Sequence, residues 1–130
     1  MITVGVPPGD VRAAGIEEFL AEFTERGKYT VSDLIEEIEA RDRQCWAVLH
    51  GQEVRAVALT QISGVRKRVC HVTHLTGDGL NEWKDAFLTI ESWARSQGCV
   101  RIEALARPGY ERVGKPYGLR KSHVLLEKDL

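Results

Sequence analysis

Apolar residues recur at helical spacing in two stretches within the first forty residues. In the first stretch the apolar positions follow an i, i+3, i+4, i+7 pattern and are Ile16, Phe19, Leu20 and Phe23. Asp10 can cap this helix, and Arg26-Gly27 supplies its stop because glycine adopts the left-handed conformation that ends many helices. The pattern predicts an amphipathic helix with one apolar face.

A second amphipathic helix is predicted directly after the first. Thr30 followed by Asp33 resembles a capping box, in which the side chains of a helix start bond to its unpaired backbone groups. The apolar positions that follow are Val31, Leu34, Ile35 and Ile38. The charged run 39–43 ends this helix.

The spacing then changes from helical to alternating. Residues 45–49 and 54–62 form two strand-like runs, and the turn 50–53 joins them into a hairpin. The turn Ser63-Gly64 precedes a third alternating run at 68–76. These three runs predict an antiparallel meander.

Gly77-Asp78-Gly79 breaks the third strand and leads into another helix, which Gln97-Gly98 closes. The apolar stripe of this helix is Trp83, Ala86, Phe87, Ile90, Trp93 and Ala94, and it is expected to pack on the sheet. The remaining chain predicts a strand at 100–106, a short helical or turn segment at 108–115, and a last strand at 122–128.

The predicted order is therefore α-α-β-β-β-α-β-α-β. It indicates an α/β fold of the α+β type, with one mixed sheet in a single domain that covers residues 1–130. The helix between the third and fourth strands is long enough for a crossover. Strands 68–76 and 100–106 are therefore expected to be parallel neighbours.

Composition narrows the function classes. With 43% apolar and 28% charged residues in 130, the chain can bury a core without disulfide or metal support. A net charge of −1 does not supply the positive field of a nucleic-acid-binding protein or of one that binds anionic membranes. Neither a long apolar span nor a charged leader is evident, so a cytoplasmic protein is expected.

The three cysteines are expected to be reduced thiols in the core. Cys45, Cys70 and Cys99 form an odd set without a C-x-x-C pair, and each lies in or beside an apolar run. His71 adjoins Cys70, but adjacent strand residues point to opposite faces, so a reactive pair is disfavoured. No metal site is predicted, because the histidines lack a third ligand at a recognisable spacing.

The segment from His74 to Leu80 is the candidate binding loop. A strand that ends in a glycine-rich turn and feeds a helix presents unpaired N–H groups and the positive end of the helix dipole, which suits a phosphate. The alternative is an ordinary connecting turn, because two glycines alone are a weak signal.

Together, the element order, this turn, and the tail with segments 109–114, 117–119 and 124–128 resemble the GNAT family of acyl-CoA N-acyltransferases. The resemblance covers nearly the whole chain. More narrowly, the strand of Trp46, the helix start Glu82-Trp83 and the tail resemble short GNAT-like proteins of phage, prophage and gene-transfer-agent clusters.

The resemblance implies acetyl-CoA as cofactor. The family motif is Gln/Arg-x-x-Gly-x-Gly/Ala; this chain keeps Gly77 and Gly79 but has His74 at the first position. The implied cofactor site consists of His74, Leu75, Thr76, Gly77, Asp78, Gly79 and Leu80. The carboxylates of Asp78 and Glu82 would repel a pyrophosphate, so binding is expected to be weak or absent.

The resemblance also implies a tyrosine that protonates the leaving thiolate. Tyr110 with Gly114 has the Tyr-x-x-x-Gly spacing, and Tyr117 is the competitor. The base that removes the amine proton is expected to be His71 or Glu103, on the two strands that border the cleft. His71 and His74 lie on opposite strand faces unless a bulge intervenes.

Two functions follow from the resemblance. The first is an acyl-CoA-dependent N-acetyltransferase, in which a small-molecule or protein amine attacks the thioester directly within a ternary complex. The second is an inactive accessory or structural protein of phage origin that keeps the fold and binds a protein partner, with a virion location. Either could form a homodimer, and no nucleic-acid or membrane partner is expected.

Overall fold

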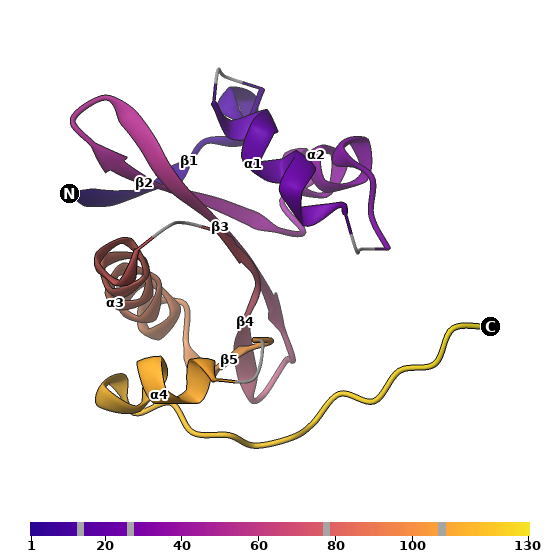
Figure 1. Cartoon of the computed structure of the whole chain (residues 1–130), viewed down its shortest axis with the longest axis vertical. Coiled ribbons are helices and arrows are strands. Elements are labelled where there is room, and N and C mark those ends of the chain that lie inside the picture. The colour runs from indigo at the N-terminus through magenta and orange to yellow at the C-terminus, as the bar shows by residue number, and fades with distance from the viewer. Residues whose placement is uncertain (13–14, 26–27, 77–78, 107–108) are drawn as a thin grey trace.

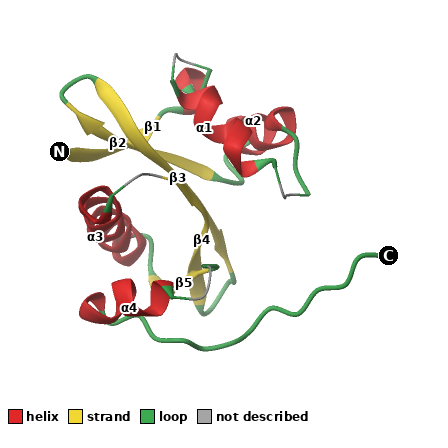
Figure 2. Ribbon diagram, in the orientation of Figure 1, coloured by secondary structure: helices red, strands yellow, loops and turns green. Residues whose placement is uncertain are grey.

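The computed structural model describes residues 1–12, 15–25, 28–76, 79–106 and 109–130. They form one five-stranded sheet with strand order β1-β2-β3-β4-β5 (Figures 1 and 2). The strands are β1 Ile2–Val6, β2 Gln44–His50, β3 Glu53–Ser63, β4 Arg68–Thr76 and β5 Cys99–Ala104. Neighbours are antiparallel except β4 and β5, which are parallel. The mixed sheet and its predicted parallel pair are confirmed.

Helices cover both faces of the sheet (Figure 1). The helices are α1 Ile16–Phe23, α2 Val31–Glu39, α3 Leu80–Ser96 and α4 Tyr110–Gly114, with 3-10 turns η1 Pro8–Asp10 and η2 Lys115–Tyr117. Because α3 connects β4 to β5, it is the crossover that makes these strands parallel.

The sheet separates two apolar clusters. On one face, Leu20 of α1 and Leu34 of α2 pack with Leu59 of β3. On the other face, Ile90 of α3 packs with Cys70 of β4. Burying each such large apolar side chain contributes about 1.5–3 kcal/mol, so the predicted helical stripes account for the layered packing.

The capping box at the start of α2 is present. The Asp33 N–H donates to Thr30 Oγ1 at 3.1 Å, and the Thr30 N–H donates to Asp33 Oδ2 at 2.9 Å. Asp10, in contrast, does not cap α1. It lies in η1, and α1 begins after Gly15, whose φ of 91° places it in the left-handed region. The predicted stop Arg26-Gly27 lies outside the described residues.

Two strand predictions are wrong. Strand β1 was not predicted, although it pairs with β2 over its whole length. Residues 122–128 were predicted as a strand, but they have no regular structure and are exposed to solvent. In both places the pairing partner decides the outcome, and local sequence does not identify that partner.

All three cysteines are free thiols, and Cys45 and Cys70 are buried, as predicted. Burial raises the pKa of Cys45 to about 12 and that of Cys70 to about 11. Neither thiol is a nucleophile near neutral pH. None of the helices in the described part of the chain is long and apolar enough to span a membrane.

Candidate active site

Strands β4 and β5 diverge where the predicted site begins. Their pairing ends with His71 opposite Glu103 and Val72 opposite Ala104, whereas β4 continues beside β3 to Thr76. Within the described residues, the β5-facing side of residues 73–76 has no strand partner. We call these four residues the free edge of β4, because their backbone groups on that side are available to a ligand.

A β-bulge at Thr73 brings the two strand histidines to one face. His71 is paired with Gln61 and His74 with Leu59, and the register shifts between Leu59 and Thr60. Paired residues share a face of the sheet, and residues 59 and 61 lie on the same face. The bulge that the sequence could not indicate therefore places both histidines on the face that α1 and α2 cover.

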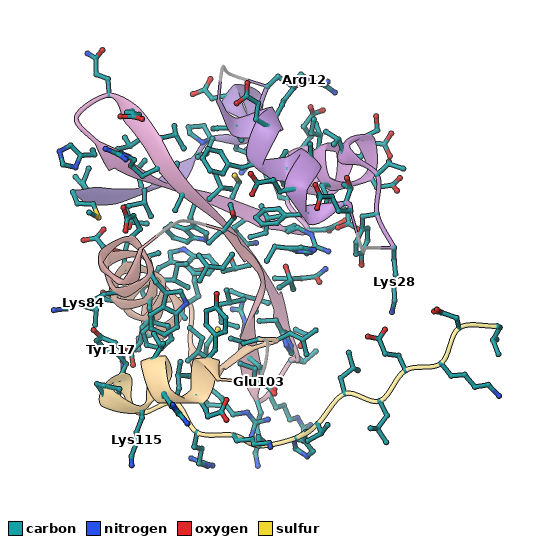
Figure 3. All side chains as sticks on the ribbon, in the orientation of Figure 1. Arg12, Lys28, Lys84, Glu103, Lys115 and Tyr117 are labelled. Atoms are coloured by element: carbon teal, nitrogen blue, oxygen red, sulfur yellow. The ribbon has the colours of Figure 1, made fainter. Side chains whose placement is uncertain are left out.

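His71 lies in a chain of three polar side chains at the start of this divergence. Its Nε2 is 2.7 Å from Ser63 Oγ, and its Nδ1 is 3.8 Å from Glu103 Oε1. Glu103 also lies 4.0 Å from Arg101 Nε. The structure thus brings together the two predicted base residues, His71 and Glu103, in a solvent-accessible position on β4 and β5. Figure 3 labels Glu103.

His74 has a drier environment than His71. Its ring lies 4.9 Å from the ring of Phe23 and 6.3 Å from that of Tyr29, measured between centroids. Its Nδ1 is 3.0 Å from Thr73 Oγ1. Burial lowers the pKa of His74 and the positive charge of Arg43 lowers it further, while Glu37 opposes the shift. Burial and Arg43 therefore both favour the neutral imidazole of His74.

Arg43, which follows α2 in the chain, contacts several of the residues around His74. Its side chain is 2% exposed, and it donates to Glu37 Oε2 at 2.7 Å and to Thr73 Oγ1 at 2.6 Å. Its guanidinium carbon also lies 5.1 Å from the centre of the Tyr29 ring. Arg43 links α2 to the bulge in β4 and so fixes the position of Thr73.

The predicted cofactor loop is described in part. Gly77 and Asp78 lie outside the described residues. Leu75 packs against the α3-side cluster, so only its backbone can meet a ligand. Thr76 donates its hydroxyl proton to Glu22 of α1 at 2.8 Å. The segment therefore offers mainly backbone groups to a ligand.

Gly79 is the N-cap of α3 and Leu80 is its first residue. The carboxylate of Glu82 folds back to the space that a Cβ at Gly79 would occupy. A negative charge thus already sits at the N-terminus of α3, where an anionic ligand would be attracted. This carboxylate lies at the end of a flexible side chain, so it can move away from Gly79 at a small cost in free energy.

The two candidate acids occupy different environments. Tyr110 is the first residue of α4, and 47% of its surface is exposed. Tyr117 packs against α3, with its ring 5.8 Å from Trp83 and 6.0 Å from Phe87 (Figure 3). Tyr117 therefore has a packing role, whereas Tyr110 is about half exposed.

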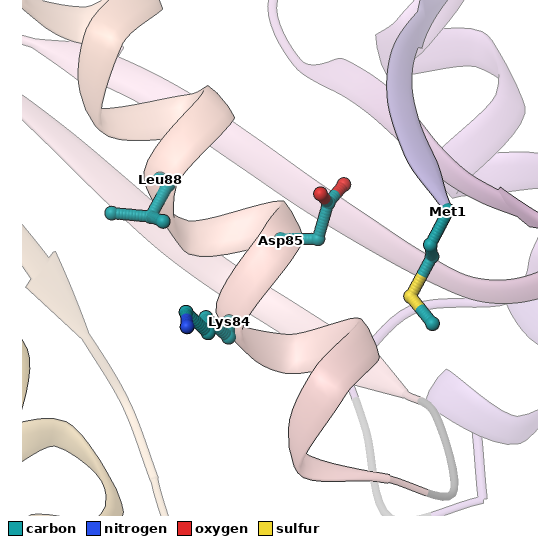
Figure 4. Close-up of a pocket in the computed structure, with 4 residues that line it drawn as sticks. All are labelled: Met1, Lys84, Asp85 and Leu88. Atoms are coloured by element: carbon teal, nitrogen blue, oxygen red, sulfur yellow. The ribbon is translucent and has the colours of Figure 1, made fainter.

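The chain has two surface pockets in its described part, and the second adjoins His71 through Ser63. One, of about 290 Å³, lies between Met1 and the α3 residues Lys84, Asp85 and Leu88 (Figure 4). The other, of about 690 Å³, lies around the β3–β4 turn and the ends of α2 and α3. None of the predicted site residues lines either pocket.

Comparison of the chain with solved structures identifies its fold. Neither a protein-family model nor a curated protein sequence matches the chain. Among solved structures, a Trypanosoma brucei acetyltransferase is 17% identical, with a TM-score of 0.76 over 98% of each chain. Glucosamine-6-phosphate N-acetyltransferase from Arabidopsis thaliana is 16% identical, with a TM-score of 0.76 over 98% of this chain and 96% of that one.

A third structure, an aminoglycoside acetyltransferase from an uncultured soil metagenomic sample, is 10% identical. Its TM-score is 0.74 over 98% of this chain and 95% of that one. The chain has the GNAT fold. The predicted GNAT resemblance is thereby confirmed for the fold, which is what similarity at these identities shows. The narrower resemblance to phage-associated proteins stays a prediction.

Three polar residues around the candidate site could not be identified from the sequence. Arg43 stands in a charged run, and such runs usually face solvent, so its burial gives no local signal. Thr73 and Ser63 are ordinary strand residues whose importance arises from the bulge and from the β3–β4 pairing. Only the three-dimensional register identifies them.

Proposed function

We propose that this chain is an acyl-CoA-dependent N-acyltransferase that transfers an acetyl or similar group to a primary amine by direct attack in a ternary complex. The observation that carries the proposal is the free edge of β4, which includes the partly buried imidazole of His74. The fold shared with several acetyltransferases supports it.

The described residues favour binding of the pantetheine arm of acyl-CoA, whereas Glu82 opposes binding of its pyrophosphate. The unpaired backbone groups of residues 73–76 fit the amides of an extended pantetheine arm. The N-terminus of α3 at Gly79 and Leu80 would hold the pyrophosphate, together with Gly77 and Asp78. Glu82 competes for that position. Acyl-CoA, when bound, supplies a thioester that an amine can attack.

Two groups on this face can accept the amine proton. His71 with Glu103 is the predicted base, but both nitrogens of His71 already face a polar partner. His74 is neutral and uses Nδ1 toward Thr73, and within the described residues its Nε2 has no hydrogen bond. The geometry favours His74 as the base, with His71 as the alternative. Tyr110, which is half exposed, would protonate the departing thiolate.

The acceptor side of this face is acidic. Helix α1 carries three glutamates, Glu17, Glu18 and Glu22, and Glu25 follows just beyond its end. Glu22 reaches Thr76 at the free edge. A field of this sign attracts a protonated amine. Two of the acetyltransferases with this fold are named for an amino sugar phosphate and for aminoglycosides, which supports a small cationic amine as acceptor. No observation favours the accessory-protein alternative.

The test is calorimetric titration of the full chain with acetyl-CoA, followed by release of free thiol in the presence of a panel of amines. We expect millimolar or tighter binding and amine-dependent thiol release. H74N should lower kcat about 100-fold, the usual size of a general-base contribution, whereas H50N should not, because His50 is exposed at the far end of β2.

Matched tyrosine variants separate the two acids. Y110F should lower kcat and leave the KM for acetyl-CoA unchanged, while Y117F should leave both unchanged because the Tyr117 ring provides packing. If the wild-type chain neither binds acetyl-CoA at millimolar concentration nor releases thiol with any amine, the accessory-protein function replaces this one.

A further inference from the structure

The larger of the two surface pockets is a groove at one end of the sheet. It has a volume of about 690 Å³ and lies between the end of α2, the β3–β4 turn and the end of α3. We call it the α2–α3 groove. None of the residues to which we assign a role in acyl transfer lines it, although Ser63, which does line it, contacts His71.

Strand β3 has an unpaired stretch of backbone along this groove. Strand β2 begins at Gln44, which lies opposite Thr60. Residues 61–63 of β3 therefore pair with β4 on one side and, within the described residues, with no strand on the other. All three line the groove. Unpaired N–H and C=O groups at a strand edge can bond to the backbone of an extended ligand, so the groove can receive a peptide group.

The groove also holds charged side chains of both signs. Arg41 and Asp42, which follow α2, line it together with Arg68, the first residue of β4. Within the described residues, none of these three side chains has an ion pair. The remaining charge, that of Glu37, is balanced by Arg43 at 2.7 Å. Guanidinium groups suit a carboxylate, and the carboxylate of Asp42 suits an ammonium group.

Arg41 occupies a backbone position that favours glycine. Its φ is 65°, its N–H donates to the Ile38 carbonyl at 3.0 Å, and the Asp42 N–H donates to the Glu37 carbonyl at 2.9 Å. These two bonds form the Schellman motif, in which the left-handed residue is usually glycine. A side chain in this conformation lowers stability, and the attraction between its charge and the helix C-terminus offsets part of that loss. The place of Arg41 in the groove supplies a reason for an arginine at this position.

We propose that the α2–α3 groove binds a small zwitterion of the amino-acid class, either a free α-amino acid or a dipeptide. Arg41 and Arg68 bind its carboxylate, and Asp42 binds its ammonium group. Helices α2 and α3 both end at the groove, and the negative ends of their dipoles also favour the ammonium group. A peptide group, where the ligand has one, pairs with residues 61–63 of β3.

The experiment is a titration of the ¹⁵N-labelled full chain with two panels of probes, the free L-amino acids and the glycyl dipeptides. We expect at least one probe to bind with a dissociation constant of about 1 mM or tighter and to shift amides in 41–44 and 61–65. Comparison of the panels identifies the size of the ligand. The C-terminal amide and the N-acetyl derivative of the tightest probe should each bind about 10-fold more weakly, because each lacks one of the two charges. No binding at millimolar concentration, or equally tight binding of acetate or inorganic phosphate, overturns the proposal.

Variants of the two arginines test the assignment within the groove. R41G and R68Q should each weaken binding of the tightest probe about 10-fold. R41G should unfold at a urea concentration no lower than that of the wild-type chain, since glycine is favoured at this position, whereas a role confined to the helix end predicts a lower one. R95Q is the matched control, because Arg95 is an exposed arginine of α3 that does not line the groove. Unchanged probe binding in R41G and R68Q overturns the proposal.

The zwitterion site and the proposed acyl transfer can fail separately. The groove lies at the start of β4, and the free edge lies at the end of that strand. R41G should therefore bind acetyl-CoA as tightly as the wild-type chain does. Loss of acetyl-CoA binding in R41G would contradict the separation of the two sites.

Discussion

The imidazole Nδ1 of His74 lies 3.0 Å from the hydroxyl oxygen of Thr73, within hydrogen-bond distance. Arg43 donates to the same oxygen, and the single hydroxyl proton of Thr73 has two acceptors within reach, the Leu59 carbonyl at 3.3 Å and the Nδ1 of His74. When that proton points to Leu59, the oxygen of Thr73 accepts from His74, and this is the arrangement we expect. It corresponds to the Nδ1-protonated tautomer and leaves the lone pair on Nε2 to accept a proton from a ligand.

The first prediction concerns this tautomer and its pKa. In a ¹⁵N NMR titration, His74 should show the Nδ1-protonated tautomer and a midpoint below the ordinary value of about 6.5, because burial and Arg43 disfavour the imidazolium. R43Q removes the charge and should move the midpoint upward. A midpoint at or above the ordinary value in the wild-type chain would contradict the network.

The second prediction concerns the effect of the lowered pKa of His74 on the free energy of unfolding. Between the lowered pKa of folded His74 and about 6.5, the unfolded chain binds more protons than the folded chain, so the free energy of unfolding rises with pH. The contribution of His74 to the free energy of unfolding is fully present above a pH of about 6.5 and is lost as the pH drops through that window. Urea unfolding should show a smaller loss in H74N, whose amide keeps a donor to Thr73 but does not titrate.

The third prediction compares a buried arginine with an exposed one. R43M should lower the free energy of unfolding by about 2–3 kcal/mol, less than for a fully buried pair because Glu37 retains some contact with water. R12M is the control, since its ion pair with Glu39 is largely exposed and should contribute under about 0.5 kcal/mol. Equal losses in urea unfolding would remove Arg43 from its bridging role.

The fourth prediction concerns the charge at the start of α3. E82Q should tighten acetyl-CoA binding about 5-fold, because a carboxylate at a helix N-terminus is worth about 1 kcal/mol and there competes with the pyrophosphate. E91Q, on the same helix far from its start, should have no effect. Calorimetric titration measures both. Weaker binding in E82Q would mean that the carboxylate assists the ligand.

The hydrophobic pattern of the sequence predicted the helices and the central strands of this fold, but it did not predict the edges of the sheet. The helical stripe of α3 and the alternating runs of β2, β3 and β4 have strong periodicity, and each was predicted within one or two residues. Strand β1 is a short run that ends at two prolines, and its strand state depends on pairing with β2, forty residues away. Residues 122–128 have the same kind of local pattern, but they pair with no strand in the part of the chain that the structure describes.

The sequence identified candidate site residues by their chemical type, but it gave little of their arrangement in space. His71 and Glu103 do lie opposite each other, since the parallel β4–β5 pair follows from the crossover. The shared face of His71 and His74 depends on one extra residue, Thr73, in the β3–β4 ladder, which no local pattern marks. Arg43 likewise needed the packing of α2 to be identified as buried.

The free edge of β4 is central to the proposed function, because acyl-CoA is proposed to bind there. Amide chemical-shift mapping of the ¹⁵N-labelled chain during titration with acetyl-CoA tests this directly. We expect saturable shifts at Thr73, His74, Leu75 and Thr76 and at the start of α3, with none in the β2–β3 hairpin. Shifts confined to the pocket around the β3–β4 turn, or no shifts at millimolar ligand, would contradict it.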